Sequence, residues 1–388
     1  MGVHIGEQCK RLGIHVNFAP VVDINVNPKN PIINARSFGE NKENVARKGI
    51  AYMKGMQSVH VMANAKHFPG HGDTDKDSHK SLPTINHTKA RMDSVELYPF
   101  YQLIQNGLAS MMVAHLNIPV YNEVANTATT LSKNVVTNLL QDSLGFKGLI
   151  FTDALNMRGV SSLYQPGIVD VKALLAGNDV LLFSEDVQLG ILEINKAIIA
   201  GEISREEVDR RCLKILRAKQ WEGLNNYQEV EKENLIEDLN TRTYELLNRK
   251  LSEASLTVLK NEKEMLPLTN LSQLKIASLS IGEGVVNEFQ QTLSLYNQVD
   301  HFTIKELESD KHAALLDTLR SYTTILVSIH KSDKNPWKSY EISSGTKDFI
   351  AKFSKSNNVV LTVFANPYSL IGFDQIEKTS GLIMGYQN

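Results

Sequence analysis

The chain has 388 residues, of which 42% are hydrophobic and 22% are charged, a composition typical of folded globular proteins and not of disordered chains. Lys and Arg total 41 against 43 Asp and Glu, and the resulting net charge of −2 offers no basic field that would bind nucleic acid. The two cysteines, Cys9 and Cys212, are too few for a disulfide framework or a cysteine-based zinc site, and no apolar run approaches the ~20 residues of a membrane span.

The first part of the chain alternates between strand-like and helix-like patterns. Short apolar runs with the length and β-branched content of buried strands occupy residues 14–24, 61–68, 109–116, 148–153 and 179–183. Apolar residues recur at helical spacing between these runs, and Ser204 followed by Glu207 predicts a capped helix start. Alternation of this kind predicts an α/β fold with a parallel sheet.

The alternation is interrupted once and then resumes. Residues 223–245 are polar and charged, and we place a linker or linking helix over residues 223–250. Strand-like runs follow at residues 255–259, 275–281, 301–304, 324–330, 359–365 and 381–384. With domains of roughly 150 residues, this pattern predicts one domain over residues 1–222 and a second, doubly wound domain over residues 251–388. The second domain contains no GxGxxG or P-loop pattern.

Polar residues concentrate in the segment KHFPGHGDTDKDSHKSLPTINH, which begins in the run 61–68 and contains four of the eleven histidines. A loop after a buried strand lies where α/β folds place catalytic residues. Asp77 and His79 are two positions apart, so in an extended backbone the carboxylate can orient the imidazole as a general acid–base. The alternative is a glycine-rich surface loop with solvated polar side chains.

Two further interpretations concern a metal and Asp153. His67, His71, Asp77 and His79 are possible metal ligands, but the Pro/Gly loop lacks the helical facing of an HxxxH site, and we predict no metal and no cofactor. Asp153 ends the run 148–153. A carboxylate at the tip of a buried strand is costly unless it is used or paired, so it predicts either a catalytic group or the N-cap of the following helix.

These residues together resemble glycoside hydrolase family 3, in its β-N-acetylhexosaminidase branch. The matching pieces, in family order over about the first 220 residues, are NFAPVVDIN, ARSFGE, KHFPGHGDTDKDSH, MMVAHL, FTDALNM and AGNDVLL. The resemblance implies a (β/α)8 TIM-type barrel followed by a smaller αβα sandwich. The second domain matches through much weaker motifs.

The resemblance also implies roles for particular residues. Asp153 matches the nucleophile that forms a covalent glycosyl-enzyme, His79 matches the acid–base, and Asp77 matches its dyad partner. Four residues match positions that hydrogen-bond sugar hydroxyls: Asp23, Arg36, Lys66 and His67. In β-glucosidase members the acid–base is a carboxylate from elsewhere in the protein, so the DSH element separates the two branches.

One departure from the family pattern bears on stability. Members of the family carry three further barrel strands before NFAPVVD, so the barrel counted here is N-terminally incomplete, with five strands instead of eight. Residues 1–20 and the closing GLIMGYQN both look like interior sequence, and we expect the chain to be a piece of a longer protein. An open barrel exposes strand edges, so the chain alone is expected to be unstable or poorly active.

The function predicted from the sequence is removal of terminal β-linked N-acetylhexosamine from cell-wall or chitin-derived saccharides by a retaining mechanism. The alternatives are a β-glucosidase or glycoside phosphorylase on the same fold, a non-catalytic carbohydrate-binding relic, and a metal-dependent hydrolase. The partner predicted is a carbohydrate substrate, with no nucleic acid and no membrane span. The sequence leaves cellular location and oligomeric state open.

Overall fold

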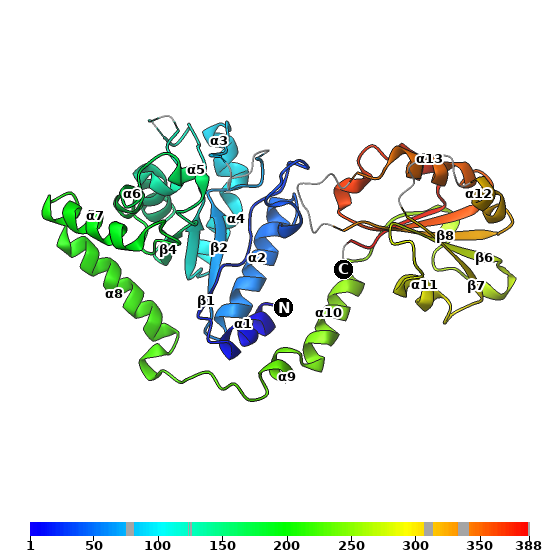
Figure 1. Cartoon of the computed structure of the whole chain (residues 1–388), viewed down its shortest axis with the longest axis horizontal. Coiled ribbons are helices and arrows are strands. Elements are labelled where there is room, and N and C mark those ends of the chain that lie inside the picture. The colour runs from blue at the N-terminus through cyan, green and yellow to red at the C-terminus, as the bar shows by residue number, and fades with distance from the viewer. Residues whose placement is uncertain (75–80, 123, 125, 306–312, 333–340, 387–388) are drawn as a thin grey trace. The chain divides into compact units, whose positions relative to one another are not determined.

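The computed structural model describes residues 1–74, 81–122, 124, 126–305, 313–332 and 341–386 (Figure 1). The chain divides into two compact units, Met1–Glu245 and Leu246–Asn388. No helix in the described ranges is long and apolar enough to cross a membrane.

Unit 1 is built on a sheet of four parallel strands in the order β1-β2-β3-β4. The strands are β1 (Val16–Asn17), β2 (Met62–Phe68), β3 (Ser110–Val113) and β4 (Leu149–Thr152). Nearly every residue of β2, β3 and β4 is buried, which explains why the sequence shows these strands as continuous apolar runs.

Two of the predicted strands are shorter than expected. The run 14–24 forms only β1 and a single further bridge between Val21 and Lys66, because Pro20 has no N–H to donate to a ladder. The prediction of a strand over residues 179–183 is wrong, since only Val180 pairs, through one parallel bridge to Phe151. Beyond that bridge, Leu182 N donates to the Thr152 hydroxyl instead of to a backbone carbonyl, and Phe183 turns the chain at a φ of +50°.

Helices alternate with the strands. The main ones are α1 (Gly2–Arg11), α2 (Lys42–Gln57), α4 (Tyr98–Gln105), α6 (Ile168–Ala176), α7 (Val187–Ile199) and α8 (Arg205–Trp221), together with a π-helical segment, Asn134–Ser143. Of these, α2 and α4 bury apolar side chains in the core against β2. The predicted cap of α8 is confirmed, because the Ser204 side chain accepts a hydrogen bond from Glu207 N. Large buried side chains of the core include Val22, Phe68, Phe100, Met111, Val135 and Ile150.

The segment predicted as a linker contains a 3-10 helix, Leu224–Asn226, and two α-helices, α9 (Leu235–Leu239) and most of α10 (Arg242–Ser255). Arg11, in the last turn of α1, holds the part that precedes α9. Its guanidinium donates to the carbonyl oxygens of Glu231 and Glu233 at 2.5 and 2.6 Å, and to the Asp238 carboxylate at 2.8 Å. Arg11 thus ties this polar segment to α1, and Gln8 of the same helix adds a hydrogen bond from its side-chain amide to the carbonyl oxygen of Leu239 at 2.9 Å.

Unit 2 contains a six-stranded sheet in the order β5-β10-β9-β8-β6-β7. The strands are β5 (Thr257–Asn261), β6 (Ile276–Ile281), β7 (Val299–Ile304), β8 (Thr324–His330), β9 (Asn358–Phe364) and β10 (Gly381–Met384). All pairs are parallel except β5 with β10. Figure 1 shows α12 (Ala313–Leu319) and α13 (Ser344–Phe353) on one face of this sheet and α11 (Glu288–Leu293) on the other.

A cavity of about 620 Å³ in unit 1 lies beside the ends of α1 and α8, and Glu222 is part of its lining. One carboxylate oxygen of Glu222 accepts a hydrogen bond from Met62 N at 3.1 Å, and the other is buried with no partner among the described residues. Burial raises the pKa of Glu222 to about 7, against the opposing effects of that hydrogen bond and of Lys10. The carboxyl is therefore held in a place that favours its neutral form.

We expect the substitution Glu222→Gln to remove a pH dependence of stability. Because the folded pKa is raised above the ordinary 4.5, the stabilisation from this carboxyl is complete below about pH 4.5 and is lost as the pH rises through about 7. The variant should gain stability over wild type at pH 8, by on the order of 1 kcal/mol, and gain little at pH 5. Urea unfolding at both pH values measures the difference. Glu229→Gln, at an exposed position of the same cavity, is the control. An equal change at both pH values would contradict the assignment.

Candidate active site

The polar residues singled out from the sequence gather where the strands of unit 1 end. Lys66 and His67 lie in β2, His115 follows β3 by two residues, and Asp153 comes directly after β4. After β1 the chain continues alongside β2, where Val21 forms a parallel bridge with Lys66. Asp23 therefore lies beside His67. Since the strands are parallel, these ends share one edge of the sheet, as expected for a catalytic site in an α/β fold.

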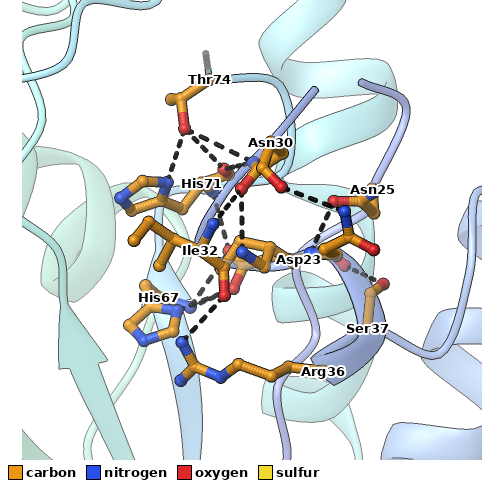
Figure 2. Close-up of polar contacts among 11 residues, drawn as sticks. Asp23, Asn25, Asn30, Ile32, Arg36, Ser37, His67, His71 and Thr74 are labelled. Carbon is orange, nitrogen blue, oxygen red and sulfur yellow. Dashed lines mark hydrogen bonds and ion pairs between the residues drawn. The ribbon is translucent and has the colours of Figure 1, made fainter. Parts of the chain in front are cut away.

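Asp23 is enclosed by the loop that follows β2. Its side chain has no exposed surface, and its two oxygens accept hydrogen bonds from His67 N, at 3.1 Å each, and from His71 N at 2.7 Å. Asp23 Oδ2 also lies 2.7 Å from His67 Nδ1 (Figure 2). Burial would raise the pKa of Asp23, but the charges and hydrogen bonds of His67 and His71 outweigh it and lower the pKa. Asp23 is thus an ionised carboxylate whose hydrogen bonds hold His67 and His71 in place.

A second loop, residues 25–37, packs against the first and brings Arg36 to the site (Figure 2). The side-chain amide of Asn30 donates to the backbone carbonyl oxygen of His71 at 2.9 Å, and its side-chain oxygen Oδ1 accepts from Ile32 N and Ile33 N. The close approach of the loops requires glycine at position 72, because a Cβ there would lie 1.8 Å from the carbonyl oxygen of Ile24.

Asp153 is held by the backbone on both sides. Asp153 N donates to the carbonyl oxygen of Val113 at 2.9 Å, and Asp153 Oδ1 accepts from Ala154 N at 2.8 Å. Burial would raise the pKa of this carboxyl, but the charges of His115 and His67 and the Ala154 N–H outweigh burial, so the pKa is lowered. The alternative that Asp153 caps a helix is wrong, since the next helix, α5 (Arg158–Ser161), has Met157 at its N-cap.

The predicted sugar-contacting cations share the electrostatic environment of the two carboxylates. Burial lowers the pKa of Lys66, and the neighbouring charge of Arg36 lowers it further. The charges of Asp153 and Asp23 act in the opposite direction. Four of the residues predicted from the sequence therefore act on one another in the folded chain.

His71 was considered from the sequence only as a possible metal ligand, and it is a buried neutral side chain. Burial, followed by the charge of His67, lowers its pKa to about 4. Its Nδ1 atom pairs with the Thr74 hydroxyl at 2.9 Å, and its Nε2 atom is buried without a partner among the described residues. Within those residues, no three His, Cys, Asp or Glu side chains are arranged to hold a metal ion.

His115 is a site residue that sequence reasoning did not assign, although it stands in the MMVAHL motif. Its side chain is fully buried. Nδ1 lies 2.7 Å from the Thr130 hydroxyl, and Nε2 lies 2.9 Å from the carbonyl oxygen of Ala154, the residue after Asp153. The signals in the sequence are its place in that motif and its position two residues past a buried strand.

Asp77 and His79, the predicted acid–base dyad, lie outside the described residues. The described residues on either side of them include Asp73 and His87, whose side chains are in close contact, with Asp73 Oδ2 3.1 Å from His87 Nε2. Glu96, which is buried, lies 3.7 Å from the same nitrogen and receives two hydrogen bonds from Arg91. These contacts bring Asp73, His87 and Glu96 close together.

Comparisons with known proteins identify the family of the chain. Residues 1–218 match the family described as Glycosyl hydrolase family 3 N terminal domain. Beta-hexosaminidase A of Pseudoalteromonas piscicida is 40% identical over 188 residues, which are 46% of this chain and 31% of that protein. A beta-N-acetylglucosaminidase/beta-glucosidase of Cellulomonas fimi is 29% identical over 273 residues, 68% of this chain and 48% of that protein.

A solved structure is similar over the whole chain. It is that of a glycoside hydrolase family 3 beta-N-acetylglucosaminidase from a Paenibacillus species, with a TM-score of 0.77 and 29% identity. The match covers 100% of this chain and 74% of that chain. The chain spans less than half the length of the two curated relatives above.

Proposed function

We propose that this chain, which belongs to glycosyl hydrolase family 3, carries the catalytic residues of a retaining glycoside hydrolase that removes terminal β-linked N-acetylhexosamine. The substrates proposed are saccharides derived from cell wall or chitin. The observation that carries the proposal is Asp153, a carboxylate with a lowered pKa at the end of β4. The names of the relatives from Pseudoalteromonas and Paenibacillus support the sugar.

The proposed reaction has two steps. In the first, a carboxylate oxygen of Asp153 bonds to the anomeric carbon while the glycosidic C–O bond breaks, and His79 gives its proton to the leaving oxygen. In the second, His79 takes a proton from water, the water oxygen bonds to the anomeric carbon, and Asp153 leaves as a carboxylate. Asp77 would orient the His79 ring. No step requires a metal or a cofactor.

The remaining predicted site residues divide into two roles. Lys66, His67 and Arg36 would hydrogen-bond the hydroxyls of the bound sugar. The carboxylate of Asp23 is enclosed, so we propose that it acts through His67. It accepts the Nδ1–H of that ring and leaves Nε2 for the substrate.

For the architecture, we propose that the four parallel strands of unit 1 are part of a (β/α)8 barrel domain over residues 1–222. The proposed second domain over residues 251–388 is an αβα sandwich, joined by the segment 223–250. The contacts of Asp153 and Asp23 at the strand ends support the barrel, since barrel enzymes place their active sites at that end.

A second candidate is a β-glucosidase or a glycoside phosphorylase, because the relative from Cellulomonas fimi is named for both N-acetylglucosaminidase and β-glucosidase. The test compares p-nitrophenyl N-acetyl-β-D-glucosaminide with the β-D-glucoside, using the protein expressed from its complete coding sequence. We expect kcat/KM to favour the N-acetyl substrate by about 100-fold or more, since a site built for the acetamido group leaves polar groups unpaired with glucose. Free sugar should be the product with and without phosphate.

Three results would contradict the proposal. Equal kcat/KM values for the two substrates would favour a β-glucosidase. A sugar 1-phosphate product in phosphate buffer would identify a phosphorylase. Binding of the sugar without turnover would indicate a non-catalytic relic.

A further inference from the structure

We propose that His115 is a positioning residue for Asp153 and that it is held as an imidazolium ion. In this role it donates a hydrogen bond to the Ala154 carbonyl oxygen and thereby orients one oxygen of the Asp153 carboxylate toward the substrate. The inference rests on the proposed function, because it assigns Asp153 as the nucleophile. It is carried by the hydrogen bonds at the two ring nitrogens of His115, which is fully buried.

The proton on Nε2 follows from its partner. Nε2 lies 2.9 Å from the carbonyl oxygen of Ala154. A carbonyl oxygen only accepts hydrogen bonds, so the ring nitrogen is the donor. A neutral imidazole with its proton on Nε2 would then have to accept at Nδ1.

The partner of Nδ1 has no proton to offer. The hydroxyl of Thr130 lies 2.7 Å from Nδ1 and 2.5 Å from the carbonyl oxygen of Ala114. A hydroxyl and a carbonyl oxygen approach this closely only with a hydrogen between them, and a hydroxyl has only one. The carbonyl of Val113, at 3.4 Å from the same hydroxyl, is likewise only an acceptor. Nδ1 therefore donates to Thr130, and both ring nitrogens carry hydrogen.

The neighbours of Thr130 keep its hydroxyl in this arrangement. The hydroxyl of Thr129 also donates to the Ala114 carbonyl, at 2.5 Å, and accepts from Leu116 N. Asn178 donates to the carbonyl oxygen of Thr130 at 2.9 Å. Each of these groups is buried and hydrogen-bonded. If the Thr130 hydroxyl turned its hydrogen toward His115, its oxygen and the Ala114 carbonyl oxygen would remain in contact with no hydrogen between them.

The imidazolium has two effects on Asp153. Ala154 is held at both ends, by His115 at its carbonyl and by Asp153 Oδ1 at its N–H. Oδ1 is thereby fixed, and Oδ2 accepts no hydrogen bond from any described residue. We assign Oδ2 as the atom that bonds to the anomeric carbon as the glycosidic C–O bond breaks, with the proton of the acid–base going to the leaving oxygen.

The second effect is electrostatic. A positive charge behind the carboxylate favours its ionised form before attack and again when it leaves the anomeric carbon. Among the opposing influences on the pKa of Asp153, the charge of His115 is the largest that lowers it. Other titratable groups that act on this carboxyl are His67 and His71, from β2 and the loop after it, and Lys66.

The protonation state of His115 can be tested on the wild-type protein without an activity measurement. NMR of protein labelled with ¹⁵N-histidine, with the His115 signals identified by their loss in His115→Gln, should show both ring nitrogens protonated at pH 7.5. One protonated and one bare nitrogen at this pH would overturn the imidazolium assignment, whatever reaction the protein catalyses.

Kinetics test the positioning role. His115→Gln should lower kcat by about 100-fold with little change in KM, as expected for a misplaced nucleophile. It should also move the acidic limb of the pH profile of kcat/KM upward by about one pH unit. Thr137→Val is the matched control, because it removes a hydroxyl that donates to a backbone carbonyl, that of Ala176 at 2.7 Å, away from His115 and Thr130, and its acidic limb should stay in place. An unshifted limb in His115→Gln would overturn the positioning role. Persistent covalent trapping in Asp153→Asn would overturn the proposed function and the nucleophile assignment, but it would leave the imidazolium assignment standing.

Discussion

Replacing Asp153 with Asn is expected to abolish covalent trapping of the protein by a 2-fluoro glycosyl donor and to reduce kcat by about 10⁴-fold or more. The amide has nearly the shape of the carboxylate but no negative charge, so it cannot form the glycosyl ester. The backbone hydrogen bonds around residue 153 explain why the fold should survive, because Ala154 N can still donate to the amide oxygen. Intact-protein mass spectrometry measures trapping, and a chromogenic substrate measures kcat.

The matched control for this variant is Asp186→Asn. Asp186 caps α7 by accepting from Leu189 N, and asparagine is an equally good N-cap. The control should be trapped as wild type is. If the fluorinated donor still trapped the Asp153→Asn protein, Asp153 would not be the nucleophile and the proposed mechanism would be wrong.

Replacing His79 with Ala is expected to separate substrates by their leaving groups. For a natural disaccharide, whose leaving oxygen needs a proton, the first step should slow by about 10² to 10⁴-fold, the range of general acid catalysis. For a 2,4-dinitrophenyl glycoside, whose leaving group departs as a stable anion, the first step should change by less than about tenfold. Pre-steady-state release of dinitrophenol and steady-state hydrolysis of the disaccharide measure the two effects.

His87→Ala is the control for the second prediction. His87 belongs to the same histidine-rich stretch but pairs with Asp73 at 3.1 Å, so any loss should be equal for the two substrates. Equal losses for both substrates in His79→Ala would argue against an acid role for His79 and would leave the DSH element without a proposed function.

The strands and the residues at their ends could be read from local patterns. β2, β4 and β10 follow their predicted runs closely because buried parallel strands are apolar along their whole length. The pattern failed at residues 179–183, where Leu182 N bonds to the Thr152 side chain and Phe183 turns the chain away from the sheet. No local pattern encodes a partner that lies 30 residues away.

The roles of individual site residues were harder to predict from the sequence, because they depend on contacts that form only in the folded chain. The KHFPGHG motif indicates where chemistry is placed, but it does not show that Asp23, 44 residues before His67, is enclosed beneath it. His115 was overlooked because a lone histidine after a strand has no distinguishing spacing. Its partners, Thr130 and Ala154, lie 15 and 39 residues further along the chain.

The amino-acid sequence by itself determined the order of strands and helices, the family, and the positions of the polar residues at the strand ends, because these depend on spacing along the chain. Only the tertiary structure decided which of those residues touch, which oxygens of Asp23 and Asp153 are already occupied, and which groups the two ring nitrogens of His115 contact. Those properties follow from hydrogen bonds between distant segments in a buried site, where every donor must find an acceptor.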